Sequence, residues 1–509
     1  MWYSPDELEL YLIDFKRGVE FKPYVTFKLP HARAIAVESD REFGLSVLQR
    51  LDAELGRRGE MYRRSGVQDL AGFRRAEPQT RMPRVLLVVD EFQELFTEDD
   101  KLSQEASLLV DRLVRQGRAF GMHVVLGSQT IGGSTTLPRT TMGQMAVRVA
   151  LQCTEADSQL ILGDTNSAAR LLTRPGEAIY NDAGGAIENN SPFQVSWLTE
   201  DERETGLSIV RKMYEASPGR GLSTVSFEGN APANASANAE LAALSQEFSS
   251  RAQRVTNASA FLGEAVAIKP PTQVVMKRRA GCNVLIIGQQ AEQASSVLAW
   301  AMISLSVQSP RKSVRFVVLG MDDADEAEFG QLVEAARALP QNVERVQYRD
   351  AAAAVVKLAE IVRDRLVNPS DEPIYFIVSG LQRFRELRKA EEKFAFNMDA
   401  TDEPQAQSAD KAIAEVLRDG PTVGVHTIAW VDTAAALDRT LERGMLREFD
   451  HRILLQMSAA DSSVLIDSPV ANKLGFFRAV YFSEEQGTIE KFRPYAMPVG
   501  EDFVRIKAL

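Results

Sequence analysis

Short apolar runs alternate with amphipathic stretches along most of the chain. The runs consist mainly of Val, Ile, Leu and Phe without a regular polar alternation, which is typical of parallel strands buried on both faces. They cover residues 10–15, 85–89, 123–126, 284–287, 314–319 and 374–378. Residues 42–58 and 104–120 have the spacing of amphipathic helices. This alternation predicts an α/β fold with mostly parallel sheets covered by helices.

A small and polar stretch interrupts the pattern. Residues 217–259 are rich in Ser, Gly, Pro, Asn and Ala, and they are predicted to form a linker. The predicted domains are therefore residues 1–216 and residues 260–509. The length agrees with this division, because 509 residues are too many for one compact domain.

The two predicted domains share an internal repeat. The run Arg148–Gln152 corresponds to Arg452–Gln456 at an offset of 304 residues, and an Ala-Asp-Ser triplet follows both runs at that same offset. Residues 117–123 match residues 420–426 at an offset of 303. Ordered matches at nearly one offset indicate that one module was duplicated.

Composition narrows the class of protein. The chain has 59 basic and 70 acidic residues, a net charge of −11, which disfavours a surface coated for nucleic acid but allows a local basic channel. No apolar run approaches the roughly 18 residues of a membrane span. Two cysteines and four histidines are too few for a disulfide scaffold or histidine-rich metal chemistry. We expect a cytoplasmic protein without a transmembrane segment.

The main catalytic motif is the apolar run 85–89, which ends in Asp90 and Glu91. Two carboxylates at the C-terminal end of a buried strand have the form of a Walker B motif. Asp90 would hold Mg²⁺, and Glu91 would orient and deprotonate the water that attacks the γ-phosphate. The next predicted strand leads to Ser128 and Gln129, which would contact the nucleotide and sense its γ-phosphate. The alternative for the two carboxylates is a capped strand end.

These motifs together resemble the FtsK/SpoIIIE family of motor ATPases, which includes the EccC ATPases of type VII secretion. The resemblance rests on Asp90–Phe92, the turn at residues 117–123, the strand end at Gln129, residues 148–163 and residues 12–18. It implies tandem RecA-like P-loop NTPase modules, ATP and Mg²⁺ as cofactors, and a homo-oligomeric ring or stack.

Ring motors of this kind use arginines that reach the nucleotide of a neighbouring subunit. By the same resemblance, Arg118 and Arg148 are the candidates. The alternative for each is a structural ion pair within its own domain.

The first module departs from the family in one respect. No Gly-x-x-x-x-Gly-Lys-[Ser/Thr] loop occurs in the chain, although such a loop is needed to cradle phosphates. The first module is therefore predicted to be N-terminally incomplete, with its P-loop supplied by an upstream segment or by another chain. The 509-residue chain alone is expected to hydrolyse ATP poorly.

The second module is predicted to be a degenerate pseudo-ATPase. Its loop position keeps Gly288 and Ser295, which we assign as degenerate nucleotide-binding residues, but has Gln293 and Ala294 where the loop needs Gly and Lys. Ser379 and Gly380 replace the two carboxylates, and Asp432 replaces Gln129.

The predicted function is part of an ATP-dependent DNA translocase, since DNA is the commoner cargo of the superfamily. A secreted polypeptide is the alternative cargo. A further alternative is a non-catalytic docking or regulatory platform.

Overall fold

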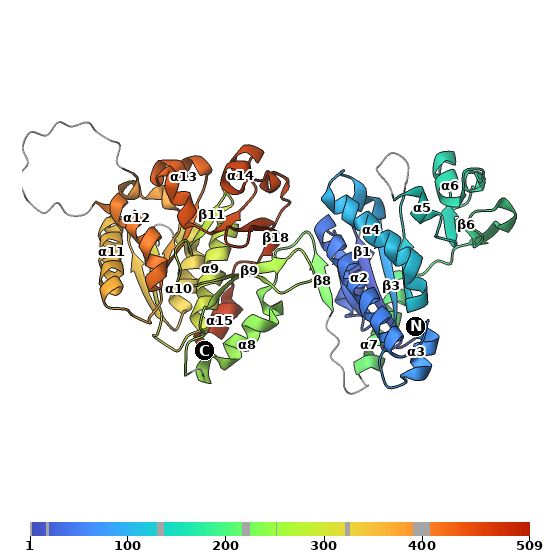
Figure 1. Cartoon of the computed structure of the whole chain (residues 1–509), viewed down its shortest axis with the longest axis horizontal. Coiled ribbons are helices and arrows are strands. Elements are labelled where there is room, and N and C mark those ends of the chain that lie inside the picture. Colours follow the sequence, from blue (N-terminus) through green and yellow to red (C-terminus); the bar gives the residue numbers. More distant parts are fainter. Residues whose placement is uncertain are drawn as a thin grey trace, which may run out of the picture. The chain divides into compact units, whose positions relative to one another are not determined.

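The computed structural model describes residues 3–16, 20–129, 137–215, 224–250, 252–320, 326–389 and 408–508. The chain divides into two compact units, Met1–Asn230 and Ala231–Leu509 (Figure 1). Within the described residues, no helix is both long and apolar enough to cross a membrane.

Unit 1 is built around a five-stranded parallel sheet with the strand order β4-β3-β1-β2-β8. A separate antiparallel sheet has the order β5-β6-β7. The elements of unit 1 are β1 (Leu8–Asp14), α1 (Lys22–Thr26), β2 (Ala32–Val37), α2 (Arg41–Arg64), α3 (Leu70–Ala76), β3 (Arg84–Asp90), α4 (Lys101–Gln116), β4 (Met122–Leu126), α5 (Arg139–Met142), β5 (Arg148–Leu151), α6 (Glu155–Leu162), β6 (Glu177–Asn181), β7 (Ser191–Gln194), α7 (Glu200–Glu215) and β8 (Val225–Glu228).

Unit 2 has one ten-stranded sheet with the order β10-β9-β18-β17-β16-β11-β15-β14-β12-β13. Its elements are α8 (Ala239–Glu247), β9 (Ser259–Ala265), β10 (Thr272–Val275), β11 (Val284–Ile287), α9 (Ala291–Val307), β12 (Arg315–Leu319), α10 (Glu326–Ala338), β13 (Asn342–Val346), α11 (Ala351–Val367), β14 (Ile374–Val378), α12 (Ala409–Asp419), β15 (Val425–Val431), α13 (Ala434–Thr440), β16 (His451–Leu454), α14 (Ala459–Ile466), β17 (Ala479–Ser483), β18 (Thr488–Pro494) and α15 (Gly500–Ala508). The six strands from β16 to β13 are parallel, and the remaining four pair antiparallel.

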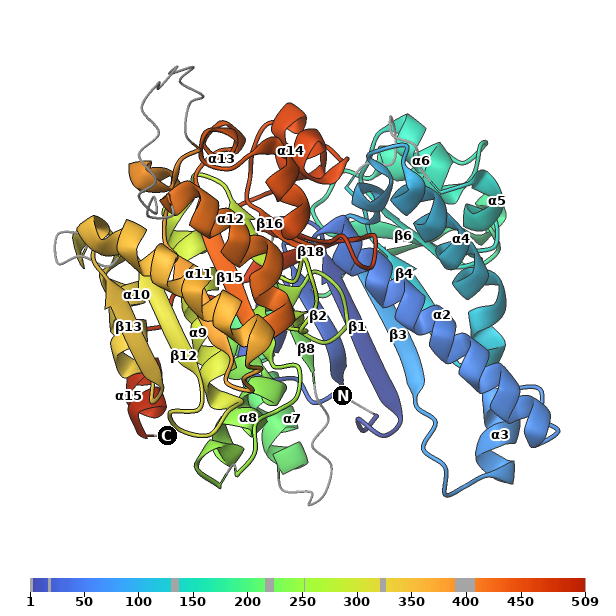
Figure 2. The same cartoon turned by 60° about the vertical axis from the view of Figure 1, so that its left-hand side comes forward.

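The predicted α/β class is confirmed, and a strand forms at each of the six predicted runs, but β4 is a partly exposed edge strand instead of a buried central one. These strands are β1, β3, β4, β11, β12 and β14. Both faces of the unit 2 sheet are covered, because α9 packs in one apolar core and α11 and α12 pack in the other (Figure 2). Fully buried strands need apolar side chains on both faces, which explains their unbroken Val, Ile and Leu runs.

Unit 1 is covered less evenly. Helices α2 and α4 pack over one face of its large sheet (Figure 2). On the other face, α1 and α7 cover β1 and β2, where Leu12, Ile35 and Leu207 share one core. The burial of that second face declines toward β4, whose Val125 is 48% exposed.

The duplication is visible in local structure. Helix α6 begins with Thr154 as its N-cap, whose hydroxyl oxygen accepts a hydrogen bond from the backbone N–H of Asp157 at 3.1 Å. The same hydroxyl donates to the Asp157 carboxylate at 2.7 Å. Helix α14 repeats both bonds at 3.1 and 2.7 Å with Ser458 and Asp461. This reciprocal cap fixes the start of the helix after β5 and after β16.

The stretch predicted as a linker contains regular structure. Residues 217–223 lie outside the described residues, but β8 adds a parallel strand to the unit 1 sheet by pairing with β2. Residues from Ala231 onward belong to unit 2, where Ala233 bridges to Tyr495 and α8 follows. The boundary between the compact units therefore falls inside this stretch, at residues 230 and 231.

Candidate active site

The predicted catalytic residues meet at the C-terminal edge of the unit 1 sheet. Asp14 at the end of β1 lies in register with Asp90 at the end of β3. Strand β4 pairs with the other side of β3 and leads to Gln129. The Lys16 ammonium joins the two sides, because it donates to Glu91 Oε1 at 2.7 Å and to Gln129 Oε1 at 2.6 Å. Parallel pairing thus gathers residues that are 113 positions apart in the chain.

Glu91 is held as a buried carboxylate, with a side chain that is 1% exposed. Burial alone would raise the pKa of Glu91. Hydrogen bonds from the Lys16 ammonium, the Gln93 amide and the backbone N–H of Gln129 outweigh burial and lower that pKa. Glu91 is therefore ionised at neutral pH, which is the form that accepts a proton.

The backbone of Glu91 is left-handed, with φ 52° and ψ 49°. Its counterpart in unit 2 is Gly380, which has φ 80° and ψ 67°. This conformation costs a non-glycine residue about 1 kcal/mol, and glycine pays almost nothing. The neighbouring backbone holds Glu91 in place, since the N–H of Phe92 donates to the Gly127 carbonyl at 3.1 Å. Glu38 and Asp467 share this conformation, so it supports a functional role for Glu91 only together with the burial and contacts of its side chain.

Asp14 and Asp90 form a pair of neighbouring carboxylates. One oxygen of Asp14 accepts the backbone N–H of Lys16 at 2.9 Å, and the other is buried with no hydrogen-bond partner among the described residues. Burial, with the adjacent charge of Asp90, raises the pKa of Asp14 to about 6. Burial also raises the pKa of Asp90. An unpartnered buried carboxylate oxygen beside a second carboxylate fits a divalent cation.

This donor set fits Mg²⁺ as nucleotide sites hold it. Within the described part of the chain, no group of three or more His, Cys, Asp or Glu side chains could hold a metal by itself. Mg²⁺ at such sites keeps several waters and takes one or two carboxylates plus substrate phosphates, so it needs no larger protein group. Asp90 and Asp14 supply that number.

Three residues of this cluster were not among the predicted site residues. Asp14 and Lys16 follow an apolar run, and Gln93 follows the Walker B carboxylates. The signal in the sequence was the two polar residues at the end of this run, Asp14 and Lys16. The pairing of β1 with β3, which is not visible in either segment alone, places Asp14 and Lys16 in the site.

The other predicted residues of unit 1 lie in three places. Ser128 is half-buried beside Gln129 at the same edge. Arg118 is exposed in the turn before β4, at the opposite end of that strand from Gln129. Arg118 is therefore separated from the carboxylates of its own unit by the length of β4.

Arg148 is engaged within unit 1. Its guanidinium donates to the backbone carbonyls of Met145, Ile161 and Leu162 at 3.1, 3.2 and 2.9 Å. Arg452 makes the matching contacts in unit 2, to the carbonyls of Phe449 and Leu465 at 3.1 and 2.7 Å. Each arginine thus ties the strand that carries it to the end of the following helix.

The loop between β11 and α9, which stands at the P-loop position of unit 2, is short and leaves no room for a phosphate. Only residues 288–290 separate β11 from α9. Gly288 has φ 147°, and a Cβ there would lie 2.5 Å from the Cβ of Leu455. Ser295 lies inside α9, and its hydroxyl is buried with no hydrogen-bond partner among the described residues. The hydroxyl that a P-loop would present to a metal is therefore enclosed in the core.

The other positions of unit 2 lack the chemistry of unit 1. Ser379 follows β14 and is completely buried, and Gly380 stands where unit 1 has Glu91. Asp432, at the position of Gln129, accepts a hydrogen bond from Thr433 Oγ1 at 3.0 Å. Neither Ser379 nor Gly380 can act as a carboxylate ligand or base.

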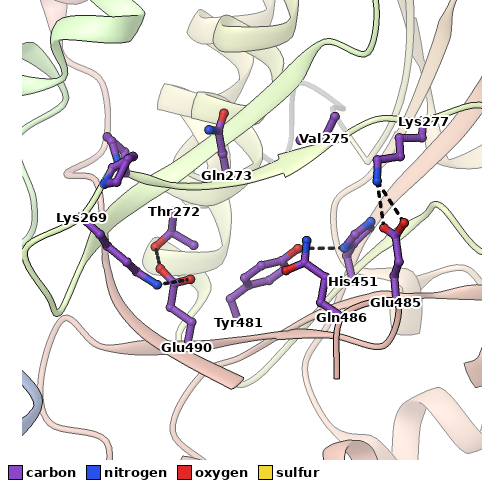
Figure 3. Close-up of a pocket in the computed structure, with 12 residues that line it drawn as sticks. Lys269, Thr272, Gln273, Val275, Lys277, His451, Tyr481, Glu485, Gln486 and Glu490 are labelled. Carbon is purple, nitrogen blue, oxygen red and sulfur yellow. Dashed lines mark hydrogen bonds and ion pairs between the residues drawn. The ribbon is translucent and has the colours of Figure 1, made fainter. Parts of the chain in front are cut away.

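A cavity of about 240 Å³ opens elsewhere on unit 2 (Figure 3). Its lining comes from β10, β16, β17 and β18 with their flanking loops, and Gly288 and Ser295 are not part of it. Lys269 pairs with Glu490 at 2.9 Å and Lys277 pairs with Glu485 at 3.0 Å, so its charged groups neutralise one another.

Comparison with known proteins identifies relatives of this chain. The sequence model of the FtsK/SpoIIIE family matches residues 1–133. The ESX-5 secretion system protein EccC5 of Mycobacterium tuberculosis is 27% identical over 217 residues, which are 41% of this chain and 15% of that protein. The DNA translocase FtsK of Helicobacter pylori is 28% identical over 219 residues, which are 42% of this chain and 24% of that protein. The chain thus spans less than a quarter of the length of either relative.

The fold has a counterpart over the whole chain. The cytoplasmic domain of the type VII secretion ATPase EccC from Thermomonospora curvata is similar with a TM-score of 0.61 at 18% identity, covering 100% of this chain and 60% of that one. The two units therefore have the tandem RecA-like fold of such ATPase domains. Residues 1–133, which carry the carboxylate cluster, belong to the FtsK/SpoIIIE family.

Proposed function

We propose that unit 1 carries the metal-binding and water-activating half of an ATP hydrolysis site, in a translocation motor of the FtsK/SpoIIIE type. The observation that carries the proposal is Glu91. It is buried, ionised and held in a left-handed backbone conformation beside Asp90 and Gln129. A capped strand end, the alternative for these carboxylates, would not require a buried carboxylate that the Lys16 ammonium and the Gln129 backbone N–H both contact.

Each side chain has a distinct role in this proposal. Bound Mg²⁺-ATP supplies the γ-phosphate and the metal charge, with Asp90 and Asp14 as the protein ligands of the metal. Glu91 accepts a proton from the attacking water, and the Gln129 amide orients that water. The Lys16 ammonium contacts Glu91 and Gln129, and its side chain is half-exposed, so phosphate charge can reach it from solvent.

The phosphate cradle belongs to a different segment. No Gly-x-x-x-x-Gly-Lys-[Ser/Thr] run occurs in residues 1–509. Unit 2 does not replace it, because its loop is three residues long and its Ser295 hydroxyl is buried. We therefore propose that unit 2 is a pseudo-ATPase and that unit 1 works with a P-loop from outside this chain segment.

The test has two arms. In the first, Mn²⁺ binding to the full chain is followed by electron paramagnetic resonance. We expect binding that Asp90→Asn weakens at least tenfold and that Asp99→Asn, a change at an exposed carboxylate, leaves intact. Equal binding by Asp90→Asn and wild type would refute the metal assignment.

In the second arm, ATP turnover is measured with and without a P-loop segment supplied. We expect turnover only with that segment, and a loss of 10²-fold or more in Glu91→Gln, the range for removing a general base. Turnover that survives in Glu91→Gln would remove Glu91 from the mechanism.

For the cargo we propose polypeptide first and DNA second. The net charge of −11 disfavours an extended nucleic-acid surface. By sequence, the EccC5 and FtsK relatives match equal shares of the chain, 41% and 42%. The preference for polypeptide therefore rests on the EccC cytoplasmic domain, whose fold covers the whole chain. DNA as cargo is supported by the similarity to FtsK. A duplex DNA mobility shift that weakens as salt rises would favour DNA.

We further propose assembly as a ring or stack. Arg118 is exposed at the end of the sheet opposite the carboxylates, so it would act on the nucleotide of a neighbouring subunit rather than on its own. Arg148 is the weaker candidate, because backbone carbonyls already occupy its guanidinium.

A further inference from the structure

The Lys16 ammonium contacts both groups that are proposed to handle the attacking water. It donates to Oε1 of Glu91 at 2.7 Å and to Oε1 of Gln129 at 2.6 Å. Glu91 is the proposed base, and the Gln129 amide is proposed to orient the water. One side chain therefore occupies an acceptor oxygen of each of these groups.

The other oxygen of the Glu91 carboxylate has separate donors. Oε2 accepts one hydrogen bond from the Gln93 amide and another from the backbone N–H of Gln129 at 3.5 Å. Neither donor belongs to Lys16. If the ammonium moves away, Oε1 becomes available to a water molecule while the contacts of Oε2 still hold the carboxylate in place.

The Lys16 side chain can change position while its backbone stays fixed. Two residues after β1, the backbone N–H of Lys16 donates to the Asp14 carboxylate at 2.9 Å, so the residue is anchored beside a proposed metal ligand. The side chain of Lys16 is 49% exposed, whereas that of Glu91 is 1% exposed. The ammonium is therefore the partner of this ion pair that an incoming phosphate reaches.

An ordinary surface ion pair is the alternative interpretation of this contact. Such pairs join two exposed side chains and contribute little to stability. Here the carboxylate is buried, and the ammonium has a second acceptor after the neighbouring strand β4. Both acceptors also belong to one proposed reaction, which favours a role for the lysine in that reaction.

Unit 2 lacks this lysine as well as the two groups that it contacts. By sequence and by the register of β12 with β14, the position of the lysine is taken by Asp322, so the charge is reversed. The positions of its two partners are taken by Gly380 and Asp432. The three residues of unit 1 are thus replaced as a set, which indicates that they work together.

Resting on the function proposed above, we propose that Lys16 is a further catalytic residue, which contacts the γ-phosphate of bound ATP. We expect the ammonium to leave Glu91 and Gln129 for the γ-phosphate, which frees Oε1 of both residues for the water. Glu91 then accepts the water proton, while the water oxygen bonds to phosphorus and the bond to ADP breaks. Lys16 keeps its own proton throughout and stabilises the charge on the phosphate.

This role makes the ammonium respond to the third phosphate alone. ADP has no γ-phosphate, so with ADP the ammonium should keep its contacts to Glu91 and Gln129. The acceptors for the water are then available only when the phosphate to be attacked is present. The same exchange of partners distinguishes ATP from ADP at this site.

Nucleotide affinity tests the contact. The full chain with a P-loop segment supplied is titrated calorimetrically with Mg²⁺ and either ADP or AMPPNP, a non-hydrolysable ATP analogue. We expect Lys16→Met to weaken AMPPNP binding roughly tenfold or more, because a charge-assisted hydrogen bond is lost, and to leave ADP binding unchanged. Lys16→Arg keeps the charge and should retain most of the affinity. Lys28→Met, at an exposed lysine before β2, should alter neither affinity.

A spectroscopic signal follows the ammonium itself. In wild-type protein labelled with a nitrogen isotope at the lysine Nζ atoms, the signal that disappears in Lys16→Arg is that of Lys16. We expect this signal to shift when AMPPNP is added and to stay in place when ADP is added. A lysine with a merely structural role would keep its signal with both nucleotides.

Three results would overturn the inference. The first is AMPPNP binding that Lys16→Met leaves intact, and the second is a Lys16 signal that AMPPNP does not shift. The third is an equal loss of affinity for AMPPNP and ADP in Lys16→Met, which would show a general disturbance of the site.

The outcome for the proposed function is separate. Turnover that is lost in Glu91→Gln, with AMPPNP binding intact in Lys16→Met, would sustain the hydrolysis mechanism and refute the role of Lys16. Turnover that survives in Glu91→Gln, with AMPPNP affinity lost in Lys16→Met, would do the reverse. A wild-type chain that binds neither nucleotide would refute both.

Discussion

The strands β4-β3-β1 of unit 1 and β15-β14-β12 of unit 2 follow the same order, but the residues at their C-terminal ends differ. Unit 1 has Asp90 and Glu91 after β3, whereas unit 2 has Ser379 and Gly380 after β14. Both units keep the left-handed residue at this corner, but only unit 1 has a charged side chain there. The duplicated fold therefore persists without the chemistry, because helix caps and apolar strands stabilise it while carboxylates do not.

The largest expected effect is that of Glu91→Gln on ATP turnover, measured with a P-loop segment supplied. We expect kcat to fall by about 10²- to 10⁴-fold, since the amide cannot accept the proton. Phosphate release measured at saturating ATP tests this. The control places the carboxylates in unit 2 with Ser379→Asp and Gly380→Glu, and it should add no turnover because the unit 2 loop is closed. Activity gained from that pair would show that unit 2 retains a usable phosphate site.

The pH dependence of stability should distinguish the two units next. The folded pKa of Asp14, about 6, lies above its ordinary value of 3.8, so the folded state holds this proton more tightly than the unfolded state. Stability from this group is full below pH 4 and is lost as pH rises to about 6, by about 3 kcal/mol. Asp14→Asn should remove this loss and raise the unfolding free energy of unit 1 at pH 7.

Urea unfolding between pH 4 and 8 measures this effect. Asp99→Asn, at an exposed position, should keep the wild-type slope. A slope that Asp14→Asn leaves unchanged would mean that the buried carboxylate titrates normally. Added Mg²⁺ should reduce the loss in wild type, because a cation favours the ionised pair.

Arg148→Ala and Arg452→Ala test whether the two units share a structural arginine. Each change leaves backbone carbonyls without their guanidinium donor, and we expect a loss of about 1–3 kcal/mol in the affected unit. Thermal unfolding of the two variants should show comparable shifts. A variant Arg148→Ala with normal stability and reduced ATP turnover would instead support a role at the nucleotide of a neighbouring subunit.

The smallest effect concerns the left-handed residue near the end of the strand, which is Glu91 in unit 1 and Gly380 in unit 2. Gly380→Ala should destabilise unit 2 by about 1 kcal/mol, because alanine is disfavoured at φ 80° and its Cβ would lie 2.8 Å from Cδ of Arg383. Gly444→Ala, where a Cβ meets nothing within 4 Å, is the control. Equal stability of both variants would show that the corner carries no strain in unit 2, and would weaken the argument from Glu91.

The sequence predicted the α/β class, the central strands and the residues at the ends of β3 and β4. These features depend on local patterns, since buried strands are apolar and their last residues are polar. Lys16 was not predicted as a site residue, because its partners Glu91 and Gln129 are 75 and 113 residues away in the sequence. The separate sheet of β5, β6 and β7 escaped as well, because strands of four or five residues give a weak periodic signal.

Lys16 gives the cluster of Asp14, Asp90 and Glu91 an internal counter-ion. Its ammonium occupies the space between Glu91 and Gln129, and its side chain is 49% exposed. A cationic ligand that enters this cluster therefore meets carboxylates whose negative charge the Lys16 ammonium already balances in part. Lys16 follows directly after the end of β1, the strand at the centre of the unit 1 sheet. The charge balance of the cluster therefore depends on one side chain at that strand end.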